Sequence, residues 1–146
     1  MATKPRAPKV MNGKWGMVYI DGDPIFEVDS FEAKLTIERE DVDFIGQMEK
    51  DSKMVGLTGE WSMKIKKIFS RGVLLLSSKI KNGNDVRVQI IAKLDDPDAY
   101  GSERLVIDNA WFNELTLMQF ENTKMIDEEY SGGFTDYYFA DTVAVQ

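Results

Sequence analysis

The fold is decided by Phe31-Glu32-Ala33-Lys34-Leu35-Thr36-Ile37-Glu38, where apolar and polar residues alternate more clearly than anywhere else in the chain. Successive side chains of a strand point to opposite faces of a sheet, so a period of two predicts a half-buried β-strand. We expect the four apolar residues of this segment to face a core. The polar residues are expected on the opposite face, in contact with water.

Other segments show the same period. At residues 60–66, Trp61, Met63 and Ile65 alternate with polar residues. Residues 15–20 also alternate, and Asp21-Gly22 is a tight hairpin signal that predicts a returning strand at residues 25–28. Later strands are expected at residues 86–92, 103–112, 115–120 and 134–139, with residues 127–133 as a charged connection.

One helix is predicted from Ser70 to Asn82. Ser70 is a suitable N-cap, and Phe69 before it is expected to pack against Leu74. Lysines near the end of this run suit the negative end of a helix dipole, and Asn82-Gly83 is suited to close it. A buried strand is the competing interpretation, because the run is short.

Two segments fall outside this pattern. Residues 1–13 contain Pro5, Pro8 and several bases, which indicates an extended N-terminal arm. Residues 40–57 are charged but also contain large apolar residues such as Phe44, Ile45 and Met48, which predicts a long loop that docks on something. Residues 14–146 are expected to form a single, mainly β domain. Its fold class is a β-sandwich or barrel of about seven strands with one flanking helix.

Composition argues against most enzyme classes. The 146 residues include no Cys and no His, which removes thiol nucleophiles, Cys/His zinc sites and imidazole bases. No apolar run is long enough to cross a bilayer, and no apolar stretch follows the basic N-terminus, so a cytoplasmic origin is expected. No membrane insertion is expected.

Charge is distributed unevenly along the chain, whose net charge is −7. Residues 1–14 carry four bases and no acid, whereas residues 95–146 carry two bases and twelve acids. A basic start and an acidic end suit head-to-tail contact between copies, although the same charges would also serve solubility alone. A net negative chain does not resemble a nucleic-acid binder.

Three polar clusters are candidate sites. Asp95, Asp96, Asp98 and Glu103 lack the spacing of a calcium loop, and a polar turn is the favoured interpretation. The acidic group from Glu38 to Asp43 is favoured as the base of a solvated loop over a magnesium site. Lys64, Lys66, Lys67 and Arg71 form a basic stretch that is expected to be solvated, with a partner surface as the alternative. No catalytic residue, metal site or cofactor is predicted.

Long alternating strands leave edges with unpaired backbone groups, which monomeric proteins normally cover or interrupt. A subunit that assembles with copies of itself can leave such edges open. Closing the strands of several copies into one barrel then removes the edges, and the polar face of each copy lines a wet interior.

The chain resembles a known family on a series of short matches in the expected order. These are Asn12-Gly13-Lys14-Trp15-Gly16, Ile20-Asp21-Gly22, Phe31-Glu32-Ala33, Gly46, Lys53, Gly56, Thr58-Gly59, Asp95-Asp96, Gly101-Ser102-Glu103-Arg104 and Asp127-Glu128-Glu129 before Phe134. On these residues it is similar to the tail tube proteins of contractile phage-type tails, in the PBSX-like prophage group. It departs from them in its longer basic arm and in Trp61, where a smaller residue is expected.

The resemblance implies a non-enzymatic structural subunit. Family members form hexameric rings that stack into a hollow tube inside a contractile sheath, with four strands per subunit in the lumen barrel. The implied partners are copies of itself, the tail sheath, tape measure and baseplate proteins, and DNA that passes without specific binding. The implied location is a virion or a phage-tail-like particle, assembled in the cytoplasm of a bacterial host.

The resemblance also assigns roles to residues, as follows. Contacts between subunits or rings are expected from the N-terminal arm and the 40–57 loop, at Lys4, Arg6, Lys9, Asp41, Phe44, Ile45, Gly46, Met48, Lys53, Met54, Val55 and Leu57. The lumen is expected to be lined by Glu32, Lys34, Thr36, Glu38, Glu60, Ser62, Lys64 and Lys66, a set with balanced charge. The outer helix is expected to offer Arg71, Ser78, Lys79 and Lys81 to the sheath.

Two other functions remain as alternatives. A monomeric small β-barrel that binds a ligand would use the 40–57 loop as a lid. A carboxylate enzyme, such as a glycosidase, would need an acidic pair in a cleft. Within the tube interpretation, a true phage, a headless bacteriocin particle and another contractile injection system are not separated by the sequence.

Overall fold

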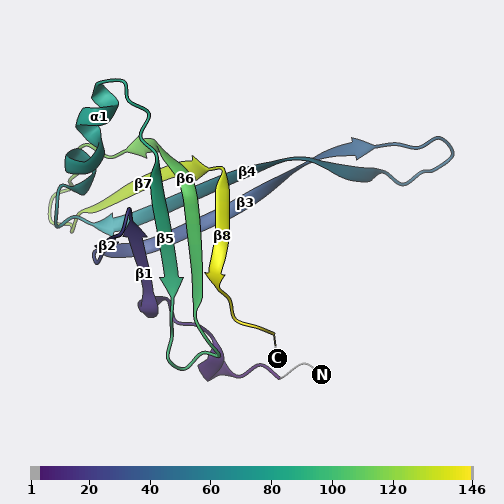
Figure 1. Ribbon diagram of the computed structural model, residues 1–146, viewed down its shortest axis with the longest axis horizontal. Coiled ribbons are helices and arrows are strands. Elements are labelled where there is room, and N and C mark those ends of the chain that lie inside the picture. Colours follow the sequence, from purple (N-terminus) through teal and green to yellow (C-terminus); the bar gives the residue numbers. More distant parts are fainter. Residues whose placement is uncertain (1–3, 146) are drawn as a thin grey trace.

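The computed structural model describes residues 4–145 and shows a mainly β protein (Figure 1). Two short 3₁₀ turns come first, η1 (Ala7–Lys9) and η2 (Gly13–Trp15). The strands are β1 (Gly16–Ile20), β2 (Asp23–Ile25), β3 (Val28–Val42), β4 (Asp51–Lys66), β5 (Val88–Leu94), β6 (Glu103–Leu115), β7 (Asp127–Phe134) and β8 (Asp136–Asp141). The helix between β4 and β5 covers residues 71–81 and includes the π-helical η3 (Val73–Ser77) and α1 (Ser78–Lys81).

All neighbouring strands are antiparallel, in the order β2-β1-β5-β6-β7-β4-β3, with β8 added beside β6. β6 belongs to two layers. Its first half pairs with β5 and β8, and its second half, from Trp111 onward, pairs with β7. The strand bends at Asn109, which has a φ of 53° and donates a 2.7 Å hydrogen bond from Nδ2 to Thr135 Oγ1. This bend separates a sheet of β1, β2, β5, β6 and β8 from a sheet of β6, β7, β4 and β3.

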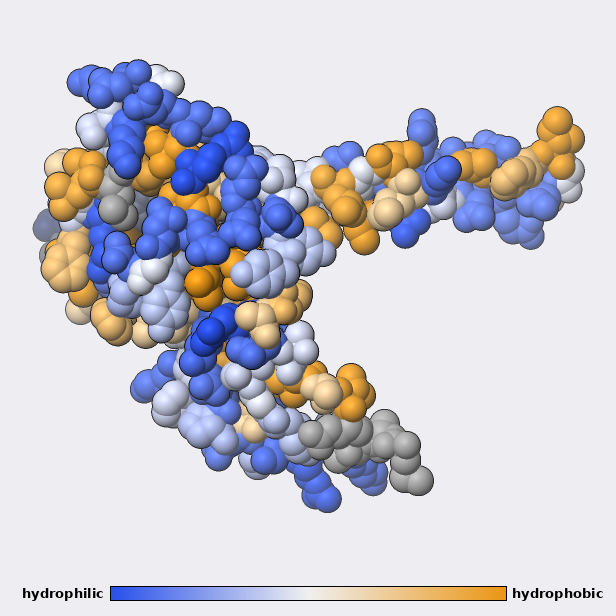
Figure 2. Space-filling model, in the orientation of Figure 1, coloured by the Kyte–Doolittle hydropathy of each residue, from blue (hydrophilic) through white to orange (hydrophobic). Residues whose placement is uncertain are grey.

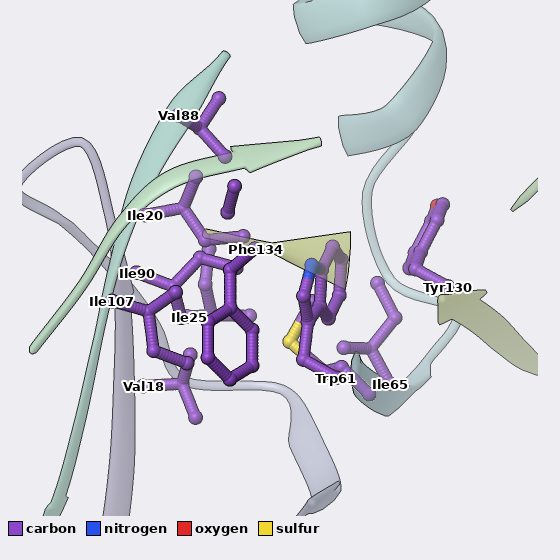
Figure 3. Packing of buried hydrophobic residues seen from close by; sticks show 12 residues of the cluster. Val18, Ile20, Ile25, Trp61, Ile65, Val88, Ile90, Ile107, Tyr130 and Phe134 are labelled. Atoms are coloured by element: carbon purple, nitrogen blue, oxygen red, sulfur yellow. The ribbon is translucent and has the colours of Figure 1, made fainter. Parts of the chain in front are cut away.

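The core lies between these two sheets (Figure 3). Ile25, Ile65, Ile90 and Ile107 are its largest fully buried apolar residues. Trp61 is also buried, and its ring meets Phe112 edge-on with centroids 4.9 Å apart. Its Nε1 donates a 3.2 Å hydrogen bond to the carbonyl of Trp111, which satisfies the one polar group of the indole.

The alternating pattern is confirmed in β4, and in β3 it holds from Phe31 to Leu35, where the apolar residues are half-buried. The expectation was wrong for Ile37, which is exposed because β3 and β4 there extend beyond the strands that cover the core. Trp61, Met63 and Ile65 are buried, whereas the residues between them face outward. The first hairpin is also confirmed, with Asp21 and Gly22 both at positive φ, but its return strand is Asp23–Ile25, earlier than expected.

The expected loop at residues 40–57 was wrong for most of its length. β3 continues to Val42 and β4 begins at Asp51, so only residues 43–50 connect them. The two strands satisfy their backbone groups by pairing with each other, for example at Glu40 with Lys53, and therefore need no core beneath them. The segment is a long projecting hairpin (Figure 1).

Two further strand assignments were wrong. The region 127–133 is a strand, because every second residue from Glu128 to Phe134 is buried. The predicted strand at 115–120 is absent from the described structure, since β6 ends at Leu115 and an irregular connection follows. The structure therefore has eight strands among the described residues.

The helix is confirmed in preference to a strand. Residues 71–81 are helical, with a π-helical centre, and Gly83 follows at a φ of 84°. Its amide donates to the Ile80 carbonyl, as expected of a closing glycine. Phe69 and Leu74 are both exposed, so the expected staple is not a buried contact. No helix in the part of the chain that the structure describes is long and apolar enough to cross a membrane.

Candidate assembly surfaces

The outward face of the sheet formed by β3, β4 and β7 is polar. Its register places Glu32 opposite Ser62, and Ser62 opposite Ser131. The eight residues expected in a lumen all lie on the same side of the β3–β4 pair, opposite the buried Trp61 and Met63, and Glu38 lies where this pair begins to project beyond β7. Seven of them are exposed and Lys64 is half-buried. The structure thus brings the whole predicted set together on one surface.

The sequence prediction missed the contribution of β7 and β6 to this face. Glu129 lies opposite Lys64, Asp127 lies opposite Lys66, and Glu114 lies opposite Ser131. The predicted eight carry three acids and three bases, and these three carboxylates make the face net acidic by three charges. The available signal for a strand here was an alternation in residues 128–134, in which Glu128, Tyr130, Gly132 and Phe134 share one face. An acidic run and two glycines hid this alternation.

A shallow polar depression of about 300 Å³ lies in this face. It is lined by Glu32, Lys34, Glu60, Trp61, Ser62, Asn113, Ser131 and Gly132. Across the described residues, no group of three or more acidic side chains is placed to hold a metal ion. Asp96, from the acidic cluster at residues 95–103, instead accepts two backbone N–H groups, from Asn12 and Asp98, each at 2.9 Å.

The projecting hairpin, residues 37–57, is called the hairpin arm below. Its apolar residues are exposed, and Ile45 and Met48 near the tip are almost fully so, at 106% and 97%. The other exposed apolar residues of the arm are Ile37, Phe44, Met54, Val55 and Leu57. The predicted contact residues Asp41, Gly46 and Lys53 are exposed as well, and Gly46 turns the tip with a φ of 86°. Figure 2 shows these apolar side chains interspersed with polar ones along the arm.

Both sheets have open strand edges among the described residues. β3 is bonded on one side only, to β4, and β8 is bonded only to β6. The second half of β6 forms the other margin of the polar sheet, since it pairs with β7 alone. Each margin offers backbone donors and acceptors to another chain.

The N-terminal arm is held against the body from Asn12 onward, by the hydrogen bond to Asp96. Lys9 lies over the ring of Tyr100, with its Nζ 5.1 Å from the centroid. Lys4, Arg6 and Lys9 are all exposed, so the structure leaves them accessible but does not place them near the hairpin arm.

Each base of the basic stretch has a carboxylate partner, although Lys66 and Lys67 remain exposed, as expected of a solvated face. Arg71 pairs with the buried Glu27, and Lys67 Nζ lies 2.6 Å from the buried Glu128. Lys64 and Lys66 lie within 4 Å of Asp127 and Asp29. Because Arg71 turns inward to Glu27, it is only half-exposed, whereas the other three predicted outer-helix residues, Ser78, Lys79 and Lys81, are exposed.

Glu128 also accepts a hydrogen bond from the hydroxyl of Tyr130. Burial, and then this bond, raise the pKa of Tyr130 well above its usual range. The hydrogen bond to Glu27 raises the pKa of Arg71, which stays charged. The Arg71–Glu27 pair joins the start of the helix to the β2–β3 turn, and the Lys67–Glu128 pair joins the segment before the helix to β7. Together they hold this end of the helix on the body.

The chain is similar to known proteins over most of its length. A family model described as "Phage tail tube protein" matches residues 3–141. Phage-like element PBSX protein XkdM of Bacillus subtilis (strain 168) is 25% identical over 134 residues, which cover 90% of this chain and 91% of XkdM.

Solved structures show a similar fold. A chain in the anti-feeding prophage tube-terminating cap has a TM-score of 0.68 at 10% identity, covering 97% of this chain and 95% of its own. A chain in the sheath-tube complex of an extracellular contractile injection system has a TM-score of 0.67 at 11% identity, covering 90% and 92%. At these identities the similarity concerns the fold alone.

Proposed function

The chain belongs to the phage tail tube protein family, and from that premise we propose that it forms hexameric rings that stack into a hollow inner tube within a contractile sheath. The single observation that supports this most is the polar sheet of β6, β7, β4 and β3, open at both margins and backed by a core. It is a structural subunit of the tail tube, and we propose no catalytic role.

Ring closure follows from the two open margins of this sheet. The outer edge of β3 on one copy would pair with the second half of β6 on the next, which gives four strands per subunit. Repetition around an axis would close the strands into one barrel and satisfy the backbone groups that are unpaired in the described monomer. The interface is heterologous and closes by rotation, so it generates a ring.

The polar face would line the lumen. Glu32, Lys34, Glu60 and Ser62 would then face the bore, together with acids of β6 and β7. A net acidic wall repels phosphate groups, so DNA would pass without being retained. The lysines are paired or flanked by carboxylates, for example Lys64 by Asp127 at 3.8 Å, and thus offer few free cations to DNA.

The outer surfaces would carry the remaining contacts. The hairpin arm would reach the adjoining ring, and Ser78, Lys79 and Lys81 on the exposed side of the helix would face the sheath. Tape measure and baseplate proteins would meet the lumen and the tube end. The particle would be a phage or a phage-tail-like particle, assembled in a bacterial host cytoplasm.

Electron microscopy of the purified chain at high concentration tests this function. Six-fold rings or hollow tubes are expected. A species that stays monomeric at every concentration would refute the proposal and favour the monomeric ligand-binding module.

The lumen assignment has a separate test. Glu32→Lys with Glu60→Lys should give tubes that retain short DNA at low salt and release it at high salt. The matched control is Asp136→Lys with Asp141→Lys, two exposed positions on β8. Equal DNA retention by both variants would contradict a lumen lined by Glu32 and Glu60.

A further inference from the structure

A second apolar cluster lies on the outer face of the sheet formed by β1, β2, β5, β6 and β8, the face turned away from the core. Val106 is only 4% exposed, although it is not part of the core cluster between the two sheets. It belongs to a row of strand-register partners that crosses four strands, which we call the outer apolar row: Tyr19, Ile91, Val106 and Tyr138. The solvated face of an antiparallel sheet is normally polar, so an apolar row on it indicates a contact surface. Figure 2 views this side of the molecule and shows apolar side chains among hydrophilic ones.

Three carboxylates border this row at the end of the sheet where β6 bends, and we call them the acidic row: Asp21, Asp108 and Asp136. Each is two residues away from a member of the outer apolar row and therefore lies on the same face. Gln89 connects two of them, since its amide donates to Asp21 Oδ1 and its Nε2 donates to Asp108 Oδ1, both at 2.9 Å. The nearest base along β5, Arg87, is already paired with Asp85 at 2.8 Å. The acidic row therefore keeps its three negative charges.

The N-terminal arm is complementary to these two rows. Residues 4–9 read Lys-Pro-Arg-Ala-Pro-Lys, with three bases and no acid. Two prolines three residues apart are typical of segments that bind aromatic surfaces in an extended conformation. Arg6 (φ −129°, ψ 138°) and Val10 (φ −70°, ψ 127°) are already extended on either side of η1. An extended segment places these prolines about 9 Å apart, which fits a row that spans about 14 Å across four strands.

The N-terminal arm leaves the sheet at the end opposite to its own acidic row. The amide of Asn12 donates to Asp96, just after the end of β5, and Lys9 lies over Tyr100 in the β5–β6 loop. The acidic row lies at the other end, where Asp108 precedes the bend of β6. In Figure 1 the arm leaves the body beyond the β3 margin, whereas the second half of β6 lies at the opposite end of the body. A ring that joins β3 of one copy to β6 of the next would therefore bring the arm of the first toward the acidic row of the second.

We propose that the outer apolar row and the acidic row receive the N-terminal arm of the next copy in the same ring. This inference rests on the proposed function, because it adds a second contact across the seam between neighbouring copies. The prolines pack against the tyrosine rings, and the bases pair with the aspartates, which orient the approach. The longer basic arm is where this chain departs from the tail tube proteins that it resembles, so the contact is a property of this chain.

NMR titration of the full chain with a synthetic peptide of residues 1–11 tests the surface directly. At a protein concentration below that of tube formation, the largest amide shifts should fall on Tyr19, Ile91, Val106 and Tyr138, and should weaken at high salt. A control peptide with Lys4→Glu and Arg6→Glu should bind at least tenfold more weakly. Equal binding of the two peptides, or shifts centred on the polar face of β3 and β4, would refute docking at these rows.

Assembly of charge-reversed chains separates this inference from the proposed function. Lys4→Glu with Arg6→Glu should raise the concentration required for rings at least threefold. Lys79→Glu with Lys81→Glu is the matched control, because it makes the same change of charge on the exposed helix and should assemble as the wild type does. Assembly of both variants at the same concentration would overturn the inference and leave ring formation intact as the function. Absence of rings from the wild-type chain would instead refute the proposed function.

Crosslinking gives a further test that does not disrupt the contact. The chain has no Cys, so Ala7→Cys on the N-terminal arm and Ala140→Cys, two residues from Tyr138 on β8, introduce the only thiols. Mixed under ring-forming conditions with a short flexible bis-maleimide, the two variants should give chain dimers. Ala7→Cys mixed with the exposed control Lys124→Cys, in the β6–β7 connection, should give at least tenfold less. Equal yields from the two mixtures, or no dimers from the first mixture in assembled rings, would count against the docked arm.

Discussion

Replacing Gly132 by alanine should destabilise the body of the protein by about 3–5 kcal/mol. A Cβ at this position would lie 1.7 Å from the carbonyl oxygen of Trp111 and 3.0 Å from the Cα of Phe112. These are backbone atoms of β6, so no side-chain rotation relieves the contact. A carbon–oxygen contact needs about 3.3 Å, so β6 would have to move roughly 1.5 Å away from β7.

The magnitude follows from what that movement breaks. Loss of about two ladder hydrogen bonds near the Phe112–Gly132 pair costs about 1 kcal/mol each. Overpacking of the core adds about 1–3 kcal/mol. The Trp111 carbonyl also accepts the hydrogen bond of Trp61 Nε1, so its displacement disturbs the core as well as the sheet margin.

Urea unfolding of the unassembled chain, followed by tryptophan fluorescence, measures this change. Gly101→Ala is the matched control, because the nearest atom to its Cβ would be Val143 Cγ2 at an ordinary 3.6 Å. The control should leave the midpoint unchanged or raise it slightly. Equal midpoints for the two variants would refute the argument that the close approach of β6 and β7 requires a glycine.

Three further predictions concern buried polar groups and the bend in β6. Arg71→Ala should lower the free energy of unfolding by about 3 kcal/mol, because it leaves the Glu27 carboxylate buried without its cation. Adding Glu27→Gln to this variant should recover part of that stability in the same urea assay. The pKa of Tyr130 in the folded protein is raised above its ordinary value of 10.0, so the neutral hydroxyl stabilises the folded state fully below pH 10. Above pH 10 the free energy of unfolding should fall as the pH rises, by up to about 1.4 kcal/mol per pH unit. Tyr130→Phe should flatten this slope in unfolding midpoints measured between pH 9 and 11, and an unchanged slope would contradict the assignment. Asn109→Val should destabilise the protein by about 1–3 kcal/mol, because a β-branched residue is strained at the positive φ of this position. Asn109→Gly should melt at a higher temperature than Asn109→Val, and the reverse order would argue against backbone strain at the bend.

Periodicity predicted the parts of the fold that depend on one strand at a time. The alternation in β3 and β4 identified the strands and sorted their residues onto a buried and an exposed face. The eight predicted lumen residues share one face for this reason. Their position in a lumen stays a prediction.

The errors arose where pairing between strands decides the structure. Residues 40–57 looked like a loop because they lack an apolar face, yet β3 and β4 need only each other to satisfy their backbone groups. Residues 127–133 looked like a connection because of Glu128 and two glycines. Glu128 is 2% exposed and paired with Lys67, and the glycines admit the close approach of β6 and the ring of Trp111.

By itself, the sequence determined that this protein is mainly β, that one face of its long strands is polar, and that it resembles tail tube proteins. These properties are local, since a period of two and a tight turn are set by neighbouring residues. Only the tertiary structure decided which strand margins stay open, how far the hairpin arm projects, and which connections meet at its other end. Those features depend on contacts between residues far apart in the chain, whose pairing no local pattern specifies.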